Sequence, residues 1–105
     1  RDYMYVKDTA TVISDLLFSD YTGVVNVSTG VPVKLADIGI RAAEIAGRRD
    51  LLHINYPEPE RWRMVFANIK HLKQNFNYSP AYTIDEGLEE TVSWWKKALA
   101  QTMQV

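Results

Sequence analysis

Two arginines set two positions apart form the group in this sequence that is best suited to hold an anion. Arg61 and Arg63 flank Trp62 in the stretch PEPERWR, after a segment that contains two prolines. Residues two apart on an extended segment point to the same side, so both guanidinium groups can face one ligand. A guanidinium offers forked N–H donors that match the geometry of a phosphate. The pattern predicts either a phosphate-binding site or an exposed edge with ordinary surface arginines.

Arg1 and Tyr3 form a second, smaller group of this kind. The guanidinium of Arg1 lies two positions from an aromatic ring, which makes a second possible anion contact. By itself this pair carries little weight.

The other polar residues give no catalytic or metal-binding set. His53 and His71 are the only histidines, and neither has a second ligand-type residue at metal-binding spacing. Glu89 and Glu90 are neighbours, and adjacent residues on a helix point about 100° apart, so a solvated face is expected there. The chain has no phosphate-cradling glycine loop, and no nucleophile–base set can be assembled. We therefore expect no catalytic, cofactor-binding or metal-binding residues.

Composition narrows the class of protein. The 105 residues suit one small domain, and 12 basic against 13 acidic side chains leave a net charge of -1. That balance argues against a nucleic-acid or anionic-membrane binder. The absence of cysteine excludes disulfides and thiol chemistry. No apolar run approaches the roughly 20 residues that cross a bilayer, and no signal peptide is present, so we expect a cytoplasmic protein.

Helical spacing of apolar residues predicts four helices that position these side chains. We expect the first to be capped by Asp8, because its carboxylate can accept from free first-turn amides. The second should stop at Gly47, a residue suited to the left-handed end of a helix. Asn68 can cap the third helix, and the last begins with the capping-box spacing of Thr83 and Glu86.

Alternating or β-branched runs predict a few short strands between the helices. The four runs are DYMYV (2–6), VVNVS (24–28), LLHINY (51–56) and RWRMVFA (61–67). The expected fold class is therefore α+β, a small single domain over residues 1–105 with about four helices.

Four blocks of the chain, in order, resemble the C-terminal part of an extended short-chain dehydrogenase/reductase. This is the NAD-dependent epimerase and dehydratase family that acts on nucleotide sugars. The first block, RDYMYVKDTA, resembles the family stretch Arg-Asp-Phe/Tyr-x-His/Tyr-Val-x-Asp. The others are VVNVSTGVPVKLADI, RMVFANIKHLKQNFNYSP and TIDEGLEETVSWWKKAL. The match runs from residue 1 to about residue 99.

The resemblance implies a substrate-binding subdomain without the Rossmann dinucleotide-binding domain. In the family, the glycine-rich loop and the Tyr-x-x-x-Lys catalytic pair lie upstream of the matched part. We therefore expect a piece of a larger enzyme, or a truncated product, that is not catalytic alone. NAD or NADP is implied only for the intact enzyme, and the expected reaction is epimerisation or dehydration that feeds polysaccharide or deoxysugar synthesis.

The resemblance also implies the binding residues. Arg1 and Tyr3 match family positions near the nucleotide and its phosphates, and Arg63 matches the arginine of the third block. Glu58 stands where a diphosphate-binding arginine is common, so Arg61 must take over that contact or it is lost. Lys34 and Asn68 also depart from the pattern, replacing a serine or threonine and an aspartate.

A rival interpretation is a standalone interaction module that kept the fold and lost the chemistry. It predicts a homo-oligomer, because faces that would pack against the Rossmann domain are left exposed. The candidate residues for such a face are Tyr3, Tyr5, Trp62 and Trp94.

Overall fold

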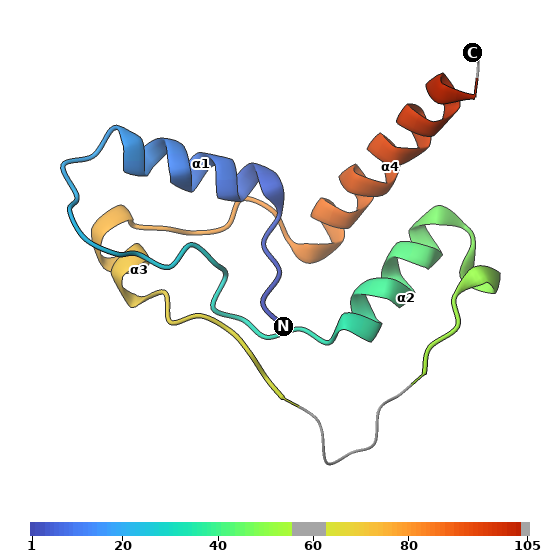
Figure 1. The fold of residues 1–105 in the computed structure, drawn as a ribbon, viewed down its shortest axis with the longest axis horizontal. Helices are drawn as coiled ribbons and strands as arrows, with labels where there is room; N and C mark the ends of the chain where they lie inside the picture. Colours follow the sequence, from blue (N-terminus) through green and yellow to red (C-terminus); the bar gives the residue numbers. More distant parts are fainter. Residues whose placement is uncertain (56–62, 104–105) are drawn as a thin grey trace.

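Four α-helices and one short 3-10 helix make up the regular structure of the described residues (Figure 1). The computed structural model describes residues 1–55 and 63–103. The elements are α1 (Val6–Leu17), α2 (Leu35–Ala46), a short 3-10 helix η1 (Arg49–Leu51), α3 (Lys70–Phe76) and α4 (Ile84–Thr102). In the described ranges there is no β-sheet, and the only bridge joins Asp2 to Pro32. The expected α+β class is therefore wrong, and the fold is all-helical.

The predicted strands fail because they find no strand to pair with. Residues 24–27, 52–55 and 63–67 lie in irregular segments, while residues 56, 61 and 62 fall outside the described ranges. Backbone amides next to two of these segments, those of Gly30 and Ala67, donate instead to the Asp2 carboxylate. A β-branched run fits a half-buried surface, but a strand also needs a neighbour that completes its hydrogen bonds.

Local capping signals fared better than the strand patterns. Gly47 ends α2 in the left-handed conformation, with φ 70°. Thr83 and Glu86 form the predicted capping box at the start of α4. The N-cap of α3 is Ile69, one residue after the predicted Asn68, although the Asn68 side chain accepts from Lys70 N (3.0 Å). The Asp8 prediction is wrong, since α1 already begins at Val6 and Asp8 lies buried in its first turn.

The hydrophobic core is small and lies to one side of the molecule. Only Val12 of α1, with Ile69 and Leu72 of the α3 region, is a buried hydrophobic residue in the described part. α2 has no buried residue and α4 has only Gly87. In Figure 1, α1 and α3 form one side of the molecule and α2 and α4 the other, with the N-terminal segment between them.

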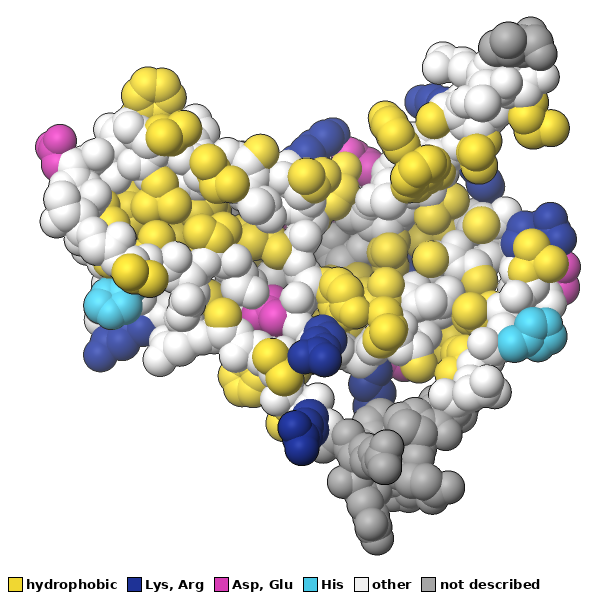
Figure 2. Space-filling model, in the orientation of Figure 1, with side chains coloured by type: hydrophobic (Ala, Val, Ile, Leu, Met, Phe, Trp, Pro, Cys, Tyr) yellow, Lys and Arg dark blue, Asp and Glu magenta, His cyan; other side chains and the backbone are white. Residues whose placement is uncertain are grey.

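The chain spreads into a slab of 48 × 45 × 20 Å. Its radius of gyration is 17.0 Å, whereas a compact domain of this length has about 13 Å. Figure 2 shows wide areas of hydrophobic side chains on the broad face of this slab, below α1 and around α4 and α2.

Candidate anion-binding groove

A groove of about 790 Å³ lies where the N-terminus meets the start of α2. Its other walls come from residues 52–55, after η1, and from residues 63–64. The lining is Arg1, Pro32, Val33, Lys34, Leu35, Ala36, Gly39, Leu52, His53, Ile54, Asn55, Arg63 and Met64. It therefore has an apolar floor with a few polar groups, which is the usual make-up of a small-molecule site.

The groove is electrostatically suited to an anion. Arg1, Lys34 and Arg63 bring three cationic side chains to its walls, and His53 adds a titratable ring. Among the described residues that line it, none is an aspartate or a glutamate. The positive charge of these side chains would favour a bound anion.

Arg1 is fixed at the groove by backbone hydrogen bonds. The backbone nitrogen of Arg1 donates to Val33 O (2.8 Å), and Val33 N donates back to Arg1 O (2.7 Å). This two-way contact joins the N-terminal segment to the residues that lead into α2. The bridge between Asp2 and Pro32 continues the same pairing.

The carboxylate of Asp2 forms hydrogen bonds to two distant segments, residues 29–30 and residue 67. It accepts hydrogen bonds from the amide and hydroxyl of Thr29, from Gly30 N (2.9 Å) and from Ala67 N (3.3 Å). Burial raises the pKa of the Asp2 carboxyl, but these hydrogen bonds outweigh it and lower the pKa from 3.8 to about 2. Gly30 is required here, because its φ is +74° and a Cβ would lie 3.0 Å from Ile69 Cγ1.

A second carboxylate, that of Asp8, holds α1 against the loop that leads into α4. It is 5% exposed and accepts from Ala81 N (3.0 Å) and Tyr82 N (3.3 Å). Asp2 and Asp8 are the two acidic residues of the first family-like block. Both act as structural acceptors that join distant segments.

The structure brings together two of the four predicted binding residues. Arg1 and Arg63 line the same groove, although 61 residues separate them in the sequence. Tyr3 is half-buried and is not among the residues that line the groove. Arg61, like Glu58 and Trp62, lies outside the described residues.

Lys34 and His53 are groove residues that the sequence analysis did not select. Lys34 had been noted only as a departure from the family pattern, and His53 only as an unsupported metal ligand. No local signal pointed to them, since both reach the groove through contacts between segments far apart in the chain. The cluster of cations around the groove becomes visible only in three dimensions.

Tyr3 and Lys7 have the Tyr-x-x-x-Lys spacing of the family's catalytic pair, which the sequence analysis passed over. Tyr3 precedes the start of α1, so the two residues do not share one helix face as residues four apart in a helix would. Lys7 Nζ donates to Glu90 Oε2 and lies 5.7 Å from the centre of the Tyr82 ring. The described contacts of Lys7 therefore do not join it to Tyr3 as a catalytic pair.

Glu90 is held in a corner formed by α1 and α4. The hydroxyl of Tyr5 also donates to Glu90 Oε2 (2.7 Å). The hydrogen bonds from Lys7 and Tyr5 lower the pKa of the Glu90 carboxyl. Glu89 is exposed, as expected for a solvated face, whereas the half-buried Glu90 departs from that expectation.

Residues 1–55 and 63–103 contain neither a metal-binding group nor a membrane-spanning helix. No group of three or more histidine or carboxylate side chains there is placed to hold a metal ion. No helix there is long and apolar enough to cross a membrane.

Comparisons with protein families, with curated proteins and with solved structures found no match to this chain. The likeness to the epimerase and dehydratase family therefore rests on the four sequence blocks alone.

Proposed function

We propose that this chain is the substrate-binding portion of an NAD(P)-dependent nucleotide-sugar epimerase or dehydratase, and that its groove binds the diphosphate of the sugar nucleotide. The observation that supports this most is that Arg1 and Arg63 line one groove. These residues match the family's first and third blocks, and guanidinium groups suit phosphate oxygens. Lys34 adds a third cation to the same walls.

The apolar floor of the groove supports the same proposal. Leu35, Leu52 and Ile54 line it beside the cations. A nucleotide sugar combines a flat base with a charged diphosphate, so it needs apolar surface next to positive charge. A titration with different nucleotide sugars identifies the base that the groove prefers.

Under this proposal the chain binds but does not catalyse by itself. The hydride chemistry belongs to NAD or NADP bound by a Rossmann domain of the intact enzyme, which is the expected partner of this portion. The intact enzyme would act in the cytoplasm on precursors of polysaccharides or deoxysugars.

A two-dimensional NMR titration tests the proposal. UDP-, GDP-, CDP- and dTDP-sugars are added in turn, and NAD is added separately. We expect amide shifts at Arg1, at Lys34 and around Arg63 with one nucleotide, and none with NAD. The single variants Arg1→Gln and Arg63→Gln should each weaken binding about tenfold, because each removes one charge-assisted contact.

Arg48→Gln is the matched control, because Arg48 is an exposed arginine paired with Asp50 and is not a groove residue. It should leave the affinity unchanged. If all three variants weakened nucleotide binding equally, the loss would come from the change in net charge and would contradict a specific contact by Arg1 or Arg63. The absence of shifts with every nucleotide sugar would contradict the groove assignment.

A further inference from the structure

One side of α4 carries an apolar stripe that nothing in the described structure covers along its second half. The residues recur every three or four positions, as in one face of a helix: Ile84, Leu88, Val92, Trp95, Leu99 and Met103. Leu88 and Val92 are half-buried. Trp95, Leu99 and Met103 are 53%, 56% and 85% exposed. We call these last three residues the α4 stripe.

The two halves of α4 differ in their packing against α2. The first half of α4 packs against α2, and farther along the helix Lys96 Nζ donates to Ile45 O (3.5 Å). Beyond that point α4 extends past the end of α2 (Figure 1). Figure 2 shows hydrophobic side chains along this part of the helix, on the broad face of the slab.

The accessible surface indicates how large a covering partner must be. The chain exposes 8447 Å², whereas a compact monomer of 12.1 kDa exposes about 6,000 Å². The surplus is about 2,400 Å². A permanent dimer hides about 1,000–2,500 Å² on each partner. The surplus belongs to the whole chain, and the α4 stripe is one part of it.

The shape of the slab fits a second slab of the same kind. Helical domains bury their apolar faces by stacking at least two layers. This chain is only 20 Å thick but 48 by 45 Å across. Two copies stacked on their broad faces would be about 40 Å thick, close to the other two dimensions, and would supply the second layer.

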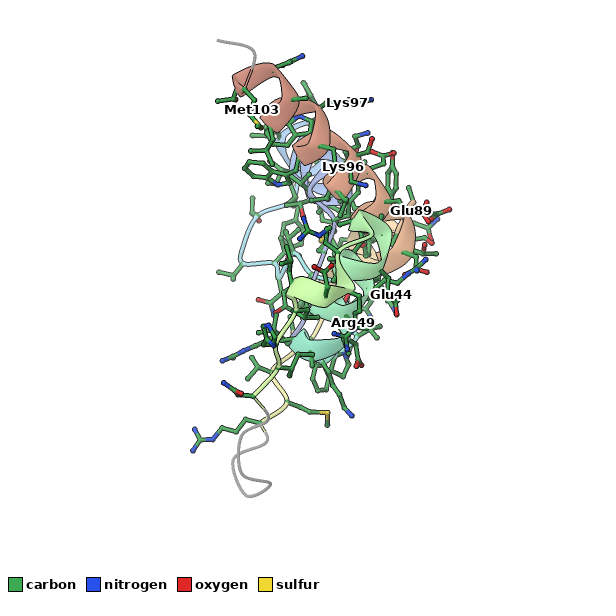
Figure 3. All side chains as sticks on the ribbon, turned by 90° about the vertical axis from the view of Figure 1, so that its right-hand side faces the viewer. Glu44, Arg49, Glu89, Lys96, Lys97 and Met103 are labelled. Atoms are coloured by element: carbon green, nitrogen blue, oxygen red, sulfur yellow. The ribbon has the colours of Figure 1, made fainter. Side chains whose placement is uncertain are left out.

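Charge does not oppose this arrangement. The net charge is -1, so two copies repel each other weakly. On the flank of α4 toward α2, Arg41 Nε lies 2.9 Å from Asp85 Oδ1 and Arg41 Nη2 lies 3.9 Å from Glu89 Oε1. On the flank toward α1, Glu90 pairs with Lys7. In Figure 3, Glu44 and Glu89 lie on one side of the slab and Met103 toward the other.

We infer that a second copy of this chain covers the α4 stripe, in a symmetric dimer. The same patch then meets itself across a two-fold axis, as in most homodimers. The inference does not rest on the proposed nucleotide-sugar site. The stripe differs from the face expected from the sequence, of which only Trp94 lies beside it and is 60% exposed. Tyr3 and Tyr5 are half-buried, and Trp62 lies outside the described residues.

Sedimentation of the 105-residue chain over a range of concentrations tests the dimer. The wild type should approach twice the monomer mass. Leu99→Glu places a charge in the stripe and should weaken the dimer at least about tenfold. Gln101→Glu is the control, since Gln101 is exposed and lies about 200° around the helix from Leu99. It adds the same charge and should leave the dimer intact.

A spin label gives a second readout that does not depend on the charged variant. The chain has no cysteine, so Gln101→Cys offers one labelling site. A symmetric dimer should give one narrow distance distribution between labels, and addition of Leu99→Glu should abolish it. Circular dichroism shows whether each variant keeps its helices.

Three outcomes would overturn the inference. The wild type could remain monomeric at every concentration, which would leave the stripe to a different partner. It could grow into open-ended aggregates without a dimer plateau. Leu99→Glu and Gln101→Glu could also behave alike while both stay helical. Because the nucleotide titration uses other residues, either proposal can fail while the other stands.

Discussion

A single carboxylate, that of Asp2, joins three parts of this chain at the edge of the groove. It accepts from Thr29, Gly30 and Ala67, which all lie in irregular segments. Those segments lack strand partners, so the carboxylate supplies acceptors that a β-ladder would otherwise provide. The residue thus links the sequence motif at the N-terminus to the placement of the groove walls.

Acid should remove the contribution of Asp2 to stability. Its folded pKa is about 2, below the ordinary value of 3.8. A lowered folded pKa stabilises the protein above pH 3.8, and that stabilisation is lost as the pH falls through about 2. Because Asp2 is only half-buried, we expect about 1–2 kcal/mol from it at neutral pH.

The variant Asp2→Asn measures this contribution. Urea unfolding at several pH values should show Asp2→Asn to be less stable than the wild type at neutral pH, with the difference shrinking below pH 3.8. Asp15→Asn, at an exposed position of α1, is the control and should show little difference at any pH. A pH-independent difference between wild type and Asp2→Asn would mean that the charge of Asp2 is not what stabilises the fold.

At the scale of the helix, α4 begins against the ring of Tyr5. A Cβ added at Gly87 would lie 3.0 Å from Tyr5 Cγ and 3.1 Å from Tyr5 Cβ. Those atoms sit at the base of the side chain and cannot move aside as a flexible tip would. Gly87 therefore allows the N-terminal segment to approach the helix, and the same approach brings the Tyr5 hydroxyl to Glu90.

Gly87→Ala and Gly39→Ala should consequently change stability in opposite directions. Alanine favours a helix over glycine by about 1 kcal/mol, so Gly39→Ala in α2 should stabilise the chain. Its Cβ would meet Leu52 Cδ1 at an ordinary 3.8 Å. Gly87→Ala should destabilise by about 1–3 kcal/mol, because overpacking outweighs the helix propensity. Thermal unfolding of both variants checks this, and a stabilising Gly87→Ala would contradict the close packing of Tyr5.

The helices were predictable because their signals are local. Gly47 and the Thr83–Glu86 capping box each act within a few residues, and both were found where expected. The strand patterns failed because a strand depends on a partner that no short window contains. The Asp8 prediction fails for a related reason. In the sequence an aspartate before an apolar helical pattern resembles a helix cap, whereas in the fold its carboxylate accepts from residues 81 and 82.

The groove was only partly predictable. Residue type and spacing predict Arg61 with Arg63 and Arg1 with Tyr3 as two separate anion contacts, and only the family resemblance relates Arg1 to Arg63. Lys34 and His53 join them through the pairing of Arg1 with Val33 and through the course of residues 52–55. These contacts are properties of the folded chain, so the sequence alone gave no reason to group the four side chains.

For the molecule as a whole, we expect the stability of the folded state to depend on protein concentration. Only three hydrophobic residues of the described part are buried, while the chain spreads into a thin slab. If a second copy covers the α4 stripe, association stabilises the folded state by mass action. The melting temperature should therefore rise with protein concentration in the wild type and stay constant in Leu99→Glu. A constant melting temperature in the wild type would contradict the dimer.

The long reach of the N-terminal segment has a consequence for synthesis on the ribosome. Asp2 bonds to Ala67, Asp8 to Ala81, and Tyr5 to Glu90. Residues 2–8 thus wait for partners that are translated many residues later. Contacts between such distant residues form slowly, because long loops must close first. We expect the bonds of Arg1 and Asp2 to residues 29–33 to form early on the nascent chain, and the Tyr5–Glu90 bond only after residue 90 has left the exit tunnel.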